Sequence, residues 1–149
     1  MLKNRKKKLK QIILASDHAG FLLKEDIKKF LLKKRKKILD LGTNNTNSVD
    51  YPDYAHMLSK KINKKNNQFG ILVCGSGTGM NMVANKYKNI RSALCYNVMS
   101  AKLSREHNNA NVMTIGSRLT KKKVALKCVN TFLNTNFKGG RHLRRVKKI

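Results

Sequence analysis

The chain has 149 residues, with 34 lysines and arginines against 7 aspartates and glutamates, giving a formal net charge of +27. This length fits one domain, and a hydrophobic content of 40% is enough for a core. No apolar stretch reaches membrane-spanning length, and the apolar run after the basic residues 1–10 is too short for a signal peptide, so we expect a cytoplasmic protein.

Strands and helices are predicted in alternation from the start of the chain. Residues 11–15 form the first expected strand, and an amphipathic helix follows Gly20. The apolar side of that helix carries Leu22, Leu23, Ile27, Phe30 and Leu31. Residues 38–41 form a short second strand, and the polar residues 43–50 form a loop.

The middle of the chain repeats the pattern. Pro52 can begin a second helix, because proline is tolerated in a first helical turn. The inner face of that helix carries Ala55, Leu58 and Ile62. Residues 69–74 form the third strand, residues 80–86 a helix, and residues 92–96 the fourth strand.

The last part contains a helix over residues 100–107, a fifth strand over 111–115 and a final helix over 121–134. This fivefold alternation predicts a single domain of the α/β class, a three-layer α/β/α Rossmann-like sandwich around a five-stranded parallel sheet. We assign the domain to residues 11–136, with a basic N-terminal extension at 1–10 and a basic C-terminal tail at 137–149.

A glycine-rich turn follows the third strand. The strand ends at the thiol of Cys74, and the turn comprises Gly75, Ser76, Gly77, Thr78 and Gly79. A strand that runs through such a turn into a helix exposes backbone N–H groups that suit an anion. A structural βα turn beside a buried cysteine gives the same pattern. The turn is weak evidence for a dinucleotide site, because Met80 stands where G-x-G-x-x-G requires its third glycine.

Polar residues follow two other strands. Asp17 and His18 come after the first strand and Arg118 after the fifth, so these residues can converge with Cys74 at the carboxyl edge of a parallel sheet. His107 and Asn108 precede the fifth strand and belong on the opposite rim. This mismatch suggests that they complete a site on a neighbouring chain.

Several ordered motifs resemble the ribose-5-phosphate isomerase B family, which also includes subunits of galactose-6-phosphate isomerase. The resemblance covers residues 11 to 146 in register. The segments that carry it are Ser16-Asp17-His18-Ala19-Gly20, Asp50-Tyr51-Pro52, Cys74-Gly75-Ser76-Gly77-Thr78-Gly79, Ala84-Asn85-Lys86, Leu103-Ser104-Arg105-Glu106-His107-Asn108, Gly116-Ser117-Arg118 and Gly139-Gly140-Arg141-His142.

The resemblance implies interconversion of ribose 5-phosphate and ribulose 5-phosphate through an enediol(ate), in the non-oxidative branch of the pentose phosphate pathway. Cys74 matches the family's base, because Met80 stands where another branch of the family has a glutamate. We expect the helix N-terminus and nearby cations to lower the pKa of Cys74. The Ser76 hydroxyl and the N–H groups of residues 75–79 fit an oxyanion hole.

The remaining roles also follow from the resemblance. His107 matches the ring-opening histidine, and Asp17 would hold sugar hydroxyls or assist there. Asn108 would bind a substrate oxygen or the oxyanion, Tyr51 would line the pocket, and Asn85 would brace the glycine turn. The phosphate ligands would be His18, Arg118, Arg141 and Arg145. Arg144, His56 and His142 have no role beyond a solvated surface in this interpretation.

The family resemblance also implies that the chain associates with a second copy, in a homodimer or tetramer whose sites are shared between chains. Isomerisation of a six-carbon phosphate such as allose or galactose 6-phosphate is the alternative reaction. A non-catalytic, nucleic-acid-associated module is the alternative class, but we do not expect it, because the basic residues are spread through the chain rather than gathered beside aromatic residues. We expect no cofactor and no metal, and Cys74, Cys95 and Cys128 lack the spacing of a zinc site or disulfide frame.

Overall fold

The computed structural model describes residues 11–63 and 68–149, so the expected extension at 1–10 lies outside the described residues. Five strands form one sheet in the order β2-β1-β3-β5-β4, and every adjacent pair is parallel. The strands are β1 (Ile12–Ser16), β2 (Ile38–Asp40), β3 (Phe69–Cys74), β4 (Ser92–Leu94) and β5 (Val112–Gly116). The predicted α/β class and five-stranded parallel sheet are confirmed.

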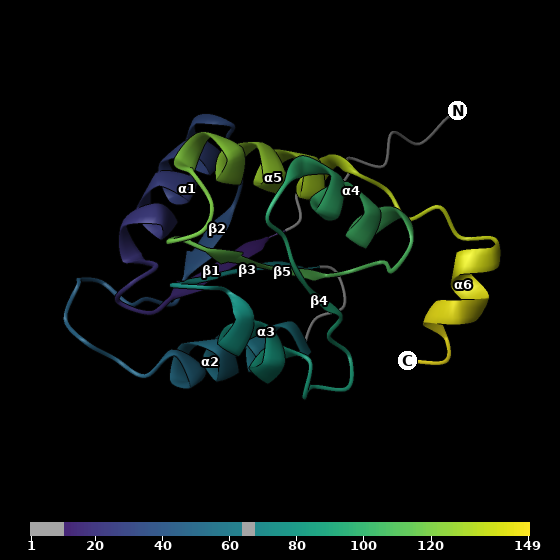
Figure 1. Ribbon diagram of the computed structural model, residues 1–149, viewed down its shortest axis with the longest axis horizontal. Helices are drawn as coiled ribbons and strands as arrows, with labels where there is room; N and C mark the ends of the chain where they lie inside the picture. The colour runs from purple at the N-terminus through teal and green to yellow at the C-terminus, as the bar shows by residue number, and fades with distance from the viewer. Residues whose placement is uncertain (1–10, 64–67) are drawn as a thin grey trace, which may run out of the picture.

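Helices cover both faces of this sheet (Figure 1). On one face lie α1 (Phe21–Lys33), α4 (Val98–Glu106) and α5 (Lys122–Asn134), and on the other α2 (Tyr51–Asn63) and α3 (Thr78–Ala84). A sixth helix, α6 (Arg141–Val146), stands apart from both layers at one end of the sheet. None of the helices in the described part of the chain is long and apolar enough to cross a membrane.

The three central strands are buried on both faces, which explains their uninterrupted apolar sequence. Every residue of β1, β3 and β5 is buried, whereas the edge strands β2 and β4 are half-buried. One core lies between the sheet and α1, α4 and α5, and it includes Ile27, Ile71 and Phe132. The second core lies beneath α2 and α3 and includes Leu58 and Met80.

Two glycines let the loops at the carboxyl edge approach one another closely. A Cβ on Gly20 would lie 2.1 Å from the carbonyl oxygen of Val73, and one on Gly116 would lie 2.5 Å from that of Ser76. Both distances are far below van der Waals contact, so only glycine fits. This packing brings the turn after β1 and the turn after β5 against the end of β3.

Some expected boundaries differ for local reasons. Helix α3 begins at Thr78, two residues earlier than predicted, because Gly77 takes a left-handed φ of 79° and ends the turn there. Helix α4 begins at Val98, because the side chains of Asn97 and Ser100 form a reciprocal capping box. Leu22 is 68% exposed rather than on the inner face. The expected tail contains α6, a short helix that the sequence pattern did not predict.

Candidate functional site

A pocket of about 410 Å³ opens at the carboxyl edge of the sheet. Three loops contribute to it, those after β1, β3 and β5, together with the start of α2. Its lining residues are Asp17, His18, Ala19, Tyr51, Cys74, Gly75, Ser76, Gly79, Arg118 and Leu119. The structure therefore brings together the polar residues that the parallel topology predicted would converge.

The sulfur of Cys74 lies at the base of the glycine turn. Its side chain is nearly buried, with the residue 5% exposed, and Sγ accepts a hydrogen bond from the backbone N–H of Gly77 at 3.1 Å. Backbone hydrogen bonds from Ser76 and Met80 also favour the thiolate. Some N–H groups of this turn are therefore directed at the sulfur, and they can stabilise its thiolate form.

The expected fall in the pKa of Cys74 is wrong. Burial raises the pKa of the thiol, and the negative charge of Asp17 raises it further. The three backbone donors lower the pKa, but each does so by less than burial raises it, and the pKa stays above its ordinary value. The sequence could not reveal this balance, because the loss of water around the sulfur arises from loops that meet only in the folded chain.

Alkylation of Cys74 tests this balance directly. A raised pKa leaves little thiolate at neutral pH, so iodoacetamide should modify Cys74 more slowly than a free thiol, and the rate should climb about tenfold per pH unit below its pKa. Asp17→Asn removes a charge that raises the pKa, so it should speed alkylation at any such pH. Mass spectrometry of timed samples measures both rates. Alkylation at neutral pH as fast as at high pH would contradict the raised pKa.

Asp17 and His18 are held by the backbone around them. Asp17 is 6% exposed, and its Oδ1 accepts a hydrogen bond from the N–H of Gly20 at 2.9 Å. Nδ1 of His18 accepts a hydrogen bond from the N–H of Val49 at 3.2 Å. A neutral His18 in this arrangement carries its proton on Nε2, which leaves a hydrogen-bond donor for a ligand.

Glycine also makes room for two large side chains at the pocket. A Cβ on Gly75 would lie 3.1 Å from a guanidinium nitrogen of Arg118, and one on Gly79 would lie 2.5 Å from the ring of Tyr51. The turn is therefore shaped so that Arg118 and Tyr51 can lie against its backbone. The Ser76 hydroxyl accepts a hydrogen bond from the N–H of Thr78 at 3.3 Å. Gly77 and Thr78 do not line the pocket.

The other predicted site residues gather at the opposite end of the sheet, where the position of His107 and Asn108 before β5 predicted that pair. His107, which follows α4, stacks on His142 of α6 with ring centroids 4.2 Å apart and an interplanar angle of 8°. Arg141 and Arg145 lie on the same short helix. Figure 1 places α6 beyond the amino ends of the strands, far from the loops that form the pocket.

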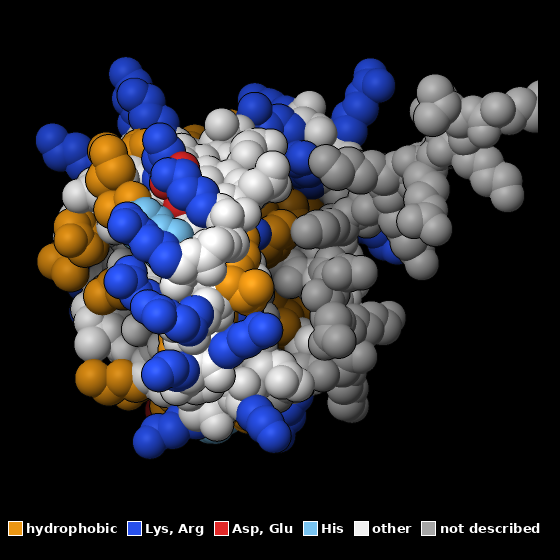
Figure 2. Space-filling view, turned by 90° about the vertical axis from the view of Figure 1, so that its right-hand side faces the viewer, with side chains coloured by type: hydrophobic (Ala, Val, Ile, Leu, Met, Phe, Trp, Pro, Cys, Tyr) orange, Lys and Arg blue, Asp and Glu red, His pale blue; other side chains and the backbone are white. Residues whose placement is uncertain are grey.

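The face that includes α6 is strongly basic. Figure 2 shows lysine and arginine side chains around half-buried histidine on this face. His142 has a pKa lowered by loss of water contact, by His107 and by the positive charges of Arg141 and Arg145. Helix α6 is attached to α4 through Lys138, whose N–H and Nζ bond the carbonyl oxygen and the carboxylate of Glu106 at 3.1 and 2.9 Å.

Two expectations for single residues need correction. His142 stacks on His107 rather than lying on a solvated surface, and its place in the motif Gly139-Gly140-Arg141-His142 is the signal in the sequence. Asn85 does not brace the glycine turn. Its amide instead bonds the N–H and the carbonyl oxygen of Ser92, at 2.8 and 3.0 Å, and so holds the start of β4.

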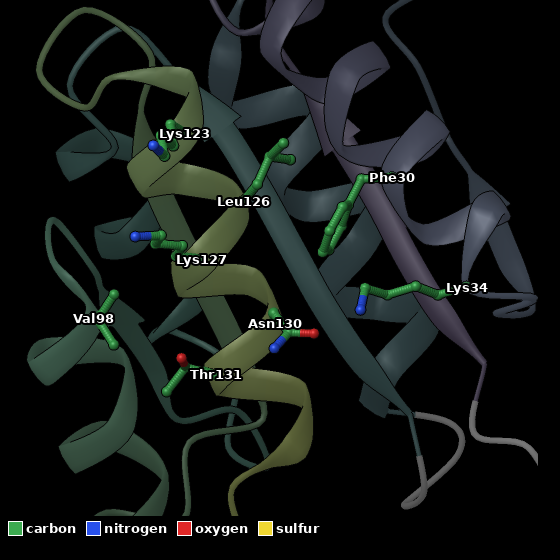
Figure 3. Close-up of a pocket in the computed structure, with 8 residues that line it drawn as sticks. All are labelled: Phe30, Lys34, Val98, Lys123, Leu126, Lys127, Asn130 and Thr131. Atoms are coloured by element: carbon green, nitrogen blue, oxygen red, sulfur yellow. The ribbon is translucent and has the colours of Figure 1, made fainter.

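A second pocket, of about 420 Å³, lies over α1 and α5 (Figure 3). Its lining residues are Phe30, Lys34, Val98, Lys123, Leu126, Lys127, Asn130 and Thr131. None of them was predicted for the site. Within residues 11–63 and 68–149, no group of three or more His, Cys, Asp or Glu side chains could hold a metal ion.

Comparison with known proteins identifies the family to which the chain belongs. Residues 12–149 match the family model described as Ribose/Galactose Isomerase. The chain belongs to the ribose/galactose isomerase family. Ribose-5-phosphate isomerase B of Escherichia coli is 38% identical over 141 residues, which cover 95% of each chain.

Solved structures of family members agree with this assignment. Ribose 5-phosphate isomerase RpiB of Thermotoga maritima is 48% identical, with a TM-score of 0.90 over 93% of this chain and 95% of that one. Ribose-5-phosphate isomerase B of Mycoplasma genitalium, determined with bound ribulose-5-phosphate, is 42% identical, with a TM-score of 0.90 over 93% of this chain and 92% of that one. The family resemblance of the motifs is confirmed.

Proposed function

We propose that this chain is a sugar-phosphate isomerase that interconverts ribose 5-phosphate and ribulose 5-phosphate. The observation that carries the proposal is the pocket in which the Cys74 thiol meets backbone N–H donors, Asp17, His18 and Arg118. Such a set suits proton transfer beside a carbonyl, together with the binding of a phosphate. The relative from Mycoplasma genitalium with bound ribulose-5-phosphate supports this choice of substrate.

The proton transfer is assigned to Cys74. In the open-chain aldose, the thiolate removes the proton from C2, and the electron pair of that C–H bond moves to form the enediolate, with negative charge on the C1 oxygen. A proton then passes from the C2 hydroxyl to the C1 oxygen, which moves the negative charge to the C2 oxygen. As the C2 oxygen forms the new carbonyl, the C1–C2 double bond takes the proton from the Cys74 thiol at C1, which yields the ketose and restores the thiolate. The turn that follows β3, with the Ser76 hydroxyl, supplies hydrogen bonds to the developing charge. The raised pKa of Cys74 makes its thiolate a strong base.

The phosphate and the closed sugar ring require further groups. His18 and Arg118 contribute from the pocket, because an Nε2–H donor and a fixed positive charge both suit a phosphate. The tail at 137–149 supplies Arg141 and Arg145. His107 opens the sugar ring with its imidazole, which Asn108 assists by binding a substrate oxygen. His142 joins this group through its stack on His107.

These two sets of residues act together only if two copies of the chain associate. In one chain, the pocket lies at the carboxyl edge of the sheet and the pair of histidines at the amino edge. We therefore propose a homodimer, or a tetramer built from such dimers, in which each site takes Cys74 from one copy and His107 from the other. The reaction needs no cofactor, and the three free thiols fit action in the cytoplasm.

Assays with purified protein test the choice of substrate. We expect a kcat/KM for ribose 5-phosphate at least about 10-fold above those for allose 6-phosphate and galactose 6-phosphate, since a pocket discriminates by roughly this factor per extra carbon. Coupled detection of each ketose measures the rates. Preference for a six-carbon substrate would make the five-carbon assignment wrong, and turnover of none of the three would overturn the isomerase proposal itself.

A further inference from the structure

Arg105 is a buried cation that no predicted role explains. It is 7% exposed, and its guanidinium carbon lies 4.9 Å from the ring centroid of Phe69 and 5.7 Å from that of Phe132. Burial and the nearby charge of Arg91 lower the pKa of Arg105. No ion pair joins either arginine to a carboxylate in the part of the chain that the structure describes. Burying a charge without a counterion costs free energy unless its N–H groups form hydrogen bonds.

The guanidinium N–H groups of Arg105 donate hydrogen bonds to the turn between α4 and β5 and to the end of α5. Nε donates to the carbonyl oxygen of Thr135 at 3.2 Å, and a terminal nitrogen donates to Oδ1 of Asn109 at 3.0 Å and to the carbonyl oxygen of Ala110. The end of α4, the start of β5 and the end of α5 therefore meet at this guanidinium. The turn between α4 and β5 is the one that carries His107 and Asn108.

Arg91 holds the same turn from a second side. Its Nε donates to the carbonyl oxygen of Asn108 at 3.0 Å, and its terminal nitrogen donates to that of Asn109 at 3.0 Å. Asn109 has a left-handed φ of 48°, which turns the chain sharply after Asn108. Two guanidinium groups thus bind residues 108–110, directly after His107, and we call this pair, Arg91 and Arg105, the arginine clasp.

We propose that the arginine clasp positions the imidazole of His107, holding it in the stack with His142 where it acts on the sugar ring. The inference rests on the proposed isomerase function. Holding two cations close together raises the free energy of the folded chain, and a surface turn that needs no fixed geometry does not require them. The two guanidinium groups suit a turn whose side chain must be placed within a fraction of an ångström, because each guanidinium can bind several oxygen atoms at once.

Arg91→Met is the sharpest test, because Arg91 is half-buried and, within the described residues, its side chain forms hydrogen bonds only with this turn. We expect kcat for ribose 5-phosphate to fall about 10-fold or more, as small misplacements of catalytic groups typically cause. KM should stay within about twofold, because the variant leaves the phosphate ligands in place. The ring-proton NMR shifts of His107 should move, because they report its stack on His142.

Three comparisons separate positioning from general damage. Arg91→Lys should lose less activity than Arg91→Met, since an ammonium can still donate to one carbonyl oxygen but lacks the fork. Arg35→Met, in a turn separated from β5 by β1 and β3, should leave kcat unchanged while removing the same charge. Circular dichroism should show all three variants folded, so that a loss of kcat cannot be attributed to unfolding.

A folded Arg91→Met variant with parental kcat and parental His107 shifts would overturn the proposal. If Arg91→Met does not fold, the same two readouts on Arg91→Lys and Arg105→Lys decide it: parental values in both would overturn it, and altered His107 shifts with a lowered kcat would support it. An inactive parent protein would instead overturn the isomerase function, and the His107 shifts would then still test whether the clasp holds the imidazole.

Discussion

Alanine at position 74 should lower kcat for the isomerisation of ribose 5-phosphate by about 10³-fold, the usual scale for loss of a general base. KM should change by no more than about threefold, because the phosphate and hydroxyl ligands remain. Cys74→Ser should be nearly as inactive, since a hydroxyl is far harder to deprotonate than a thiol. Steady-state kinetics of both variants, with circular dichroism to confirm folding, give the result.

The other two cysteines provide matched controls. Cys95 and Cys128 are fully buried in the core beneath α4 and α5, and burial raises the pKa of Cys95 to about 12. Cys95→Ala and Cys128→Ala should lose only stability, on the order of 1 kcal/mol each from the small cavity, and keep kcat within about twofold. A Cys74→Ala variant as active as these controls would contradict the assignment of the Cys74 thiol as the base.

Two inactive variants should restore activity to each other if the site is shared between chains. Cys74→Ala disables the pocket, and His107→Ala disables the cluster at the opposite edge. When equal amounts are unfolded together and refolded, half of the dimers are mixed, and each mixed dimer has one intact site. About a quarter of the parental activity should therefore return.

The control for this experiment pairs two variants from the same edge. Cys74→Ala mixed with Asp17→Ala should restore nothing, because every mixed dimer then has a damaged pocket in both sites. Comparison of the two mixtures removes any effect of refolding. Equal activity in both mixtures, or none in the mixture of Cys74→Ala and His107→Ala, would contradict a site shared between two chains.

The position of the pocket could be predicted from the sequence because it depends on topology alone. The strand–helix alternation requires a parallel sheet, and a parallel sheet places the residues after β1, β3 and β5 at one edge. Asp17, Cys74 and Arg118 follow those strands, so their meeting required no knowledge of side-chain packing. The separation of His107 from them followed from the same rule.

The properties of those residues depended on contacts that no local pattern encodes. The sign of the pKa shift of Cys74 is set by burial beneath loops that glycines at 20 and 116 allow to close over it. The stack of His142 on His107 depends on α6, a six-residue helix that is too short to give a clear helical period in the sequence.

Periodicity and chain order are enough to predict the class of fold and the edge of the sheet on which each motif lies, and the family is indicated by the resemblance of the motifs. The acidity of the Cys74 thiol, the pairing of His107 with His142 and the hydrogen-bond partners of Arg105 arise only in the folded chain. Those outcomes depend on solvent exclusion and on hydrogen bonds between segments distant in the chain, which exist only once the layers have packed together.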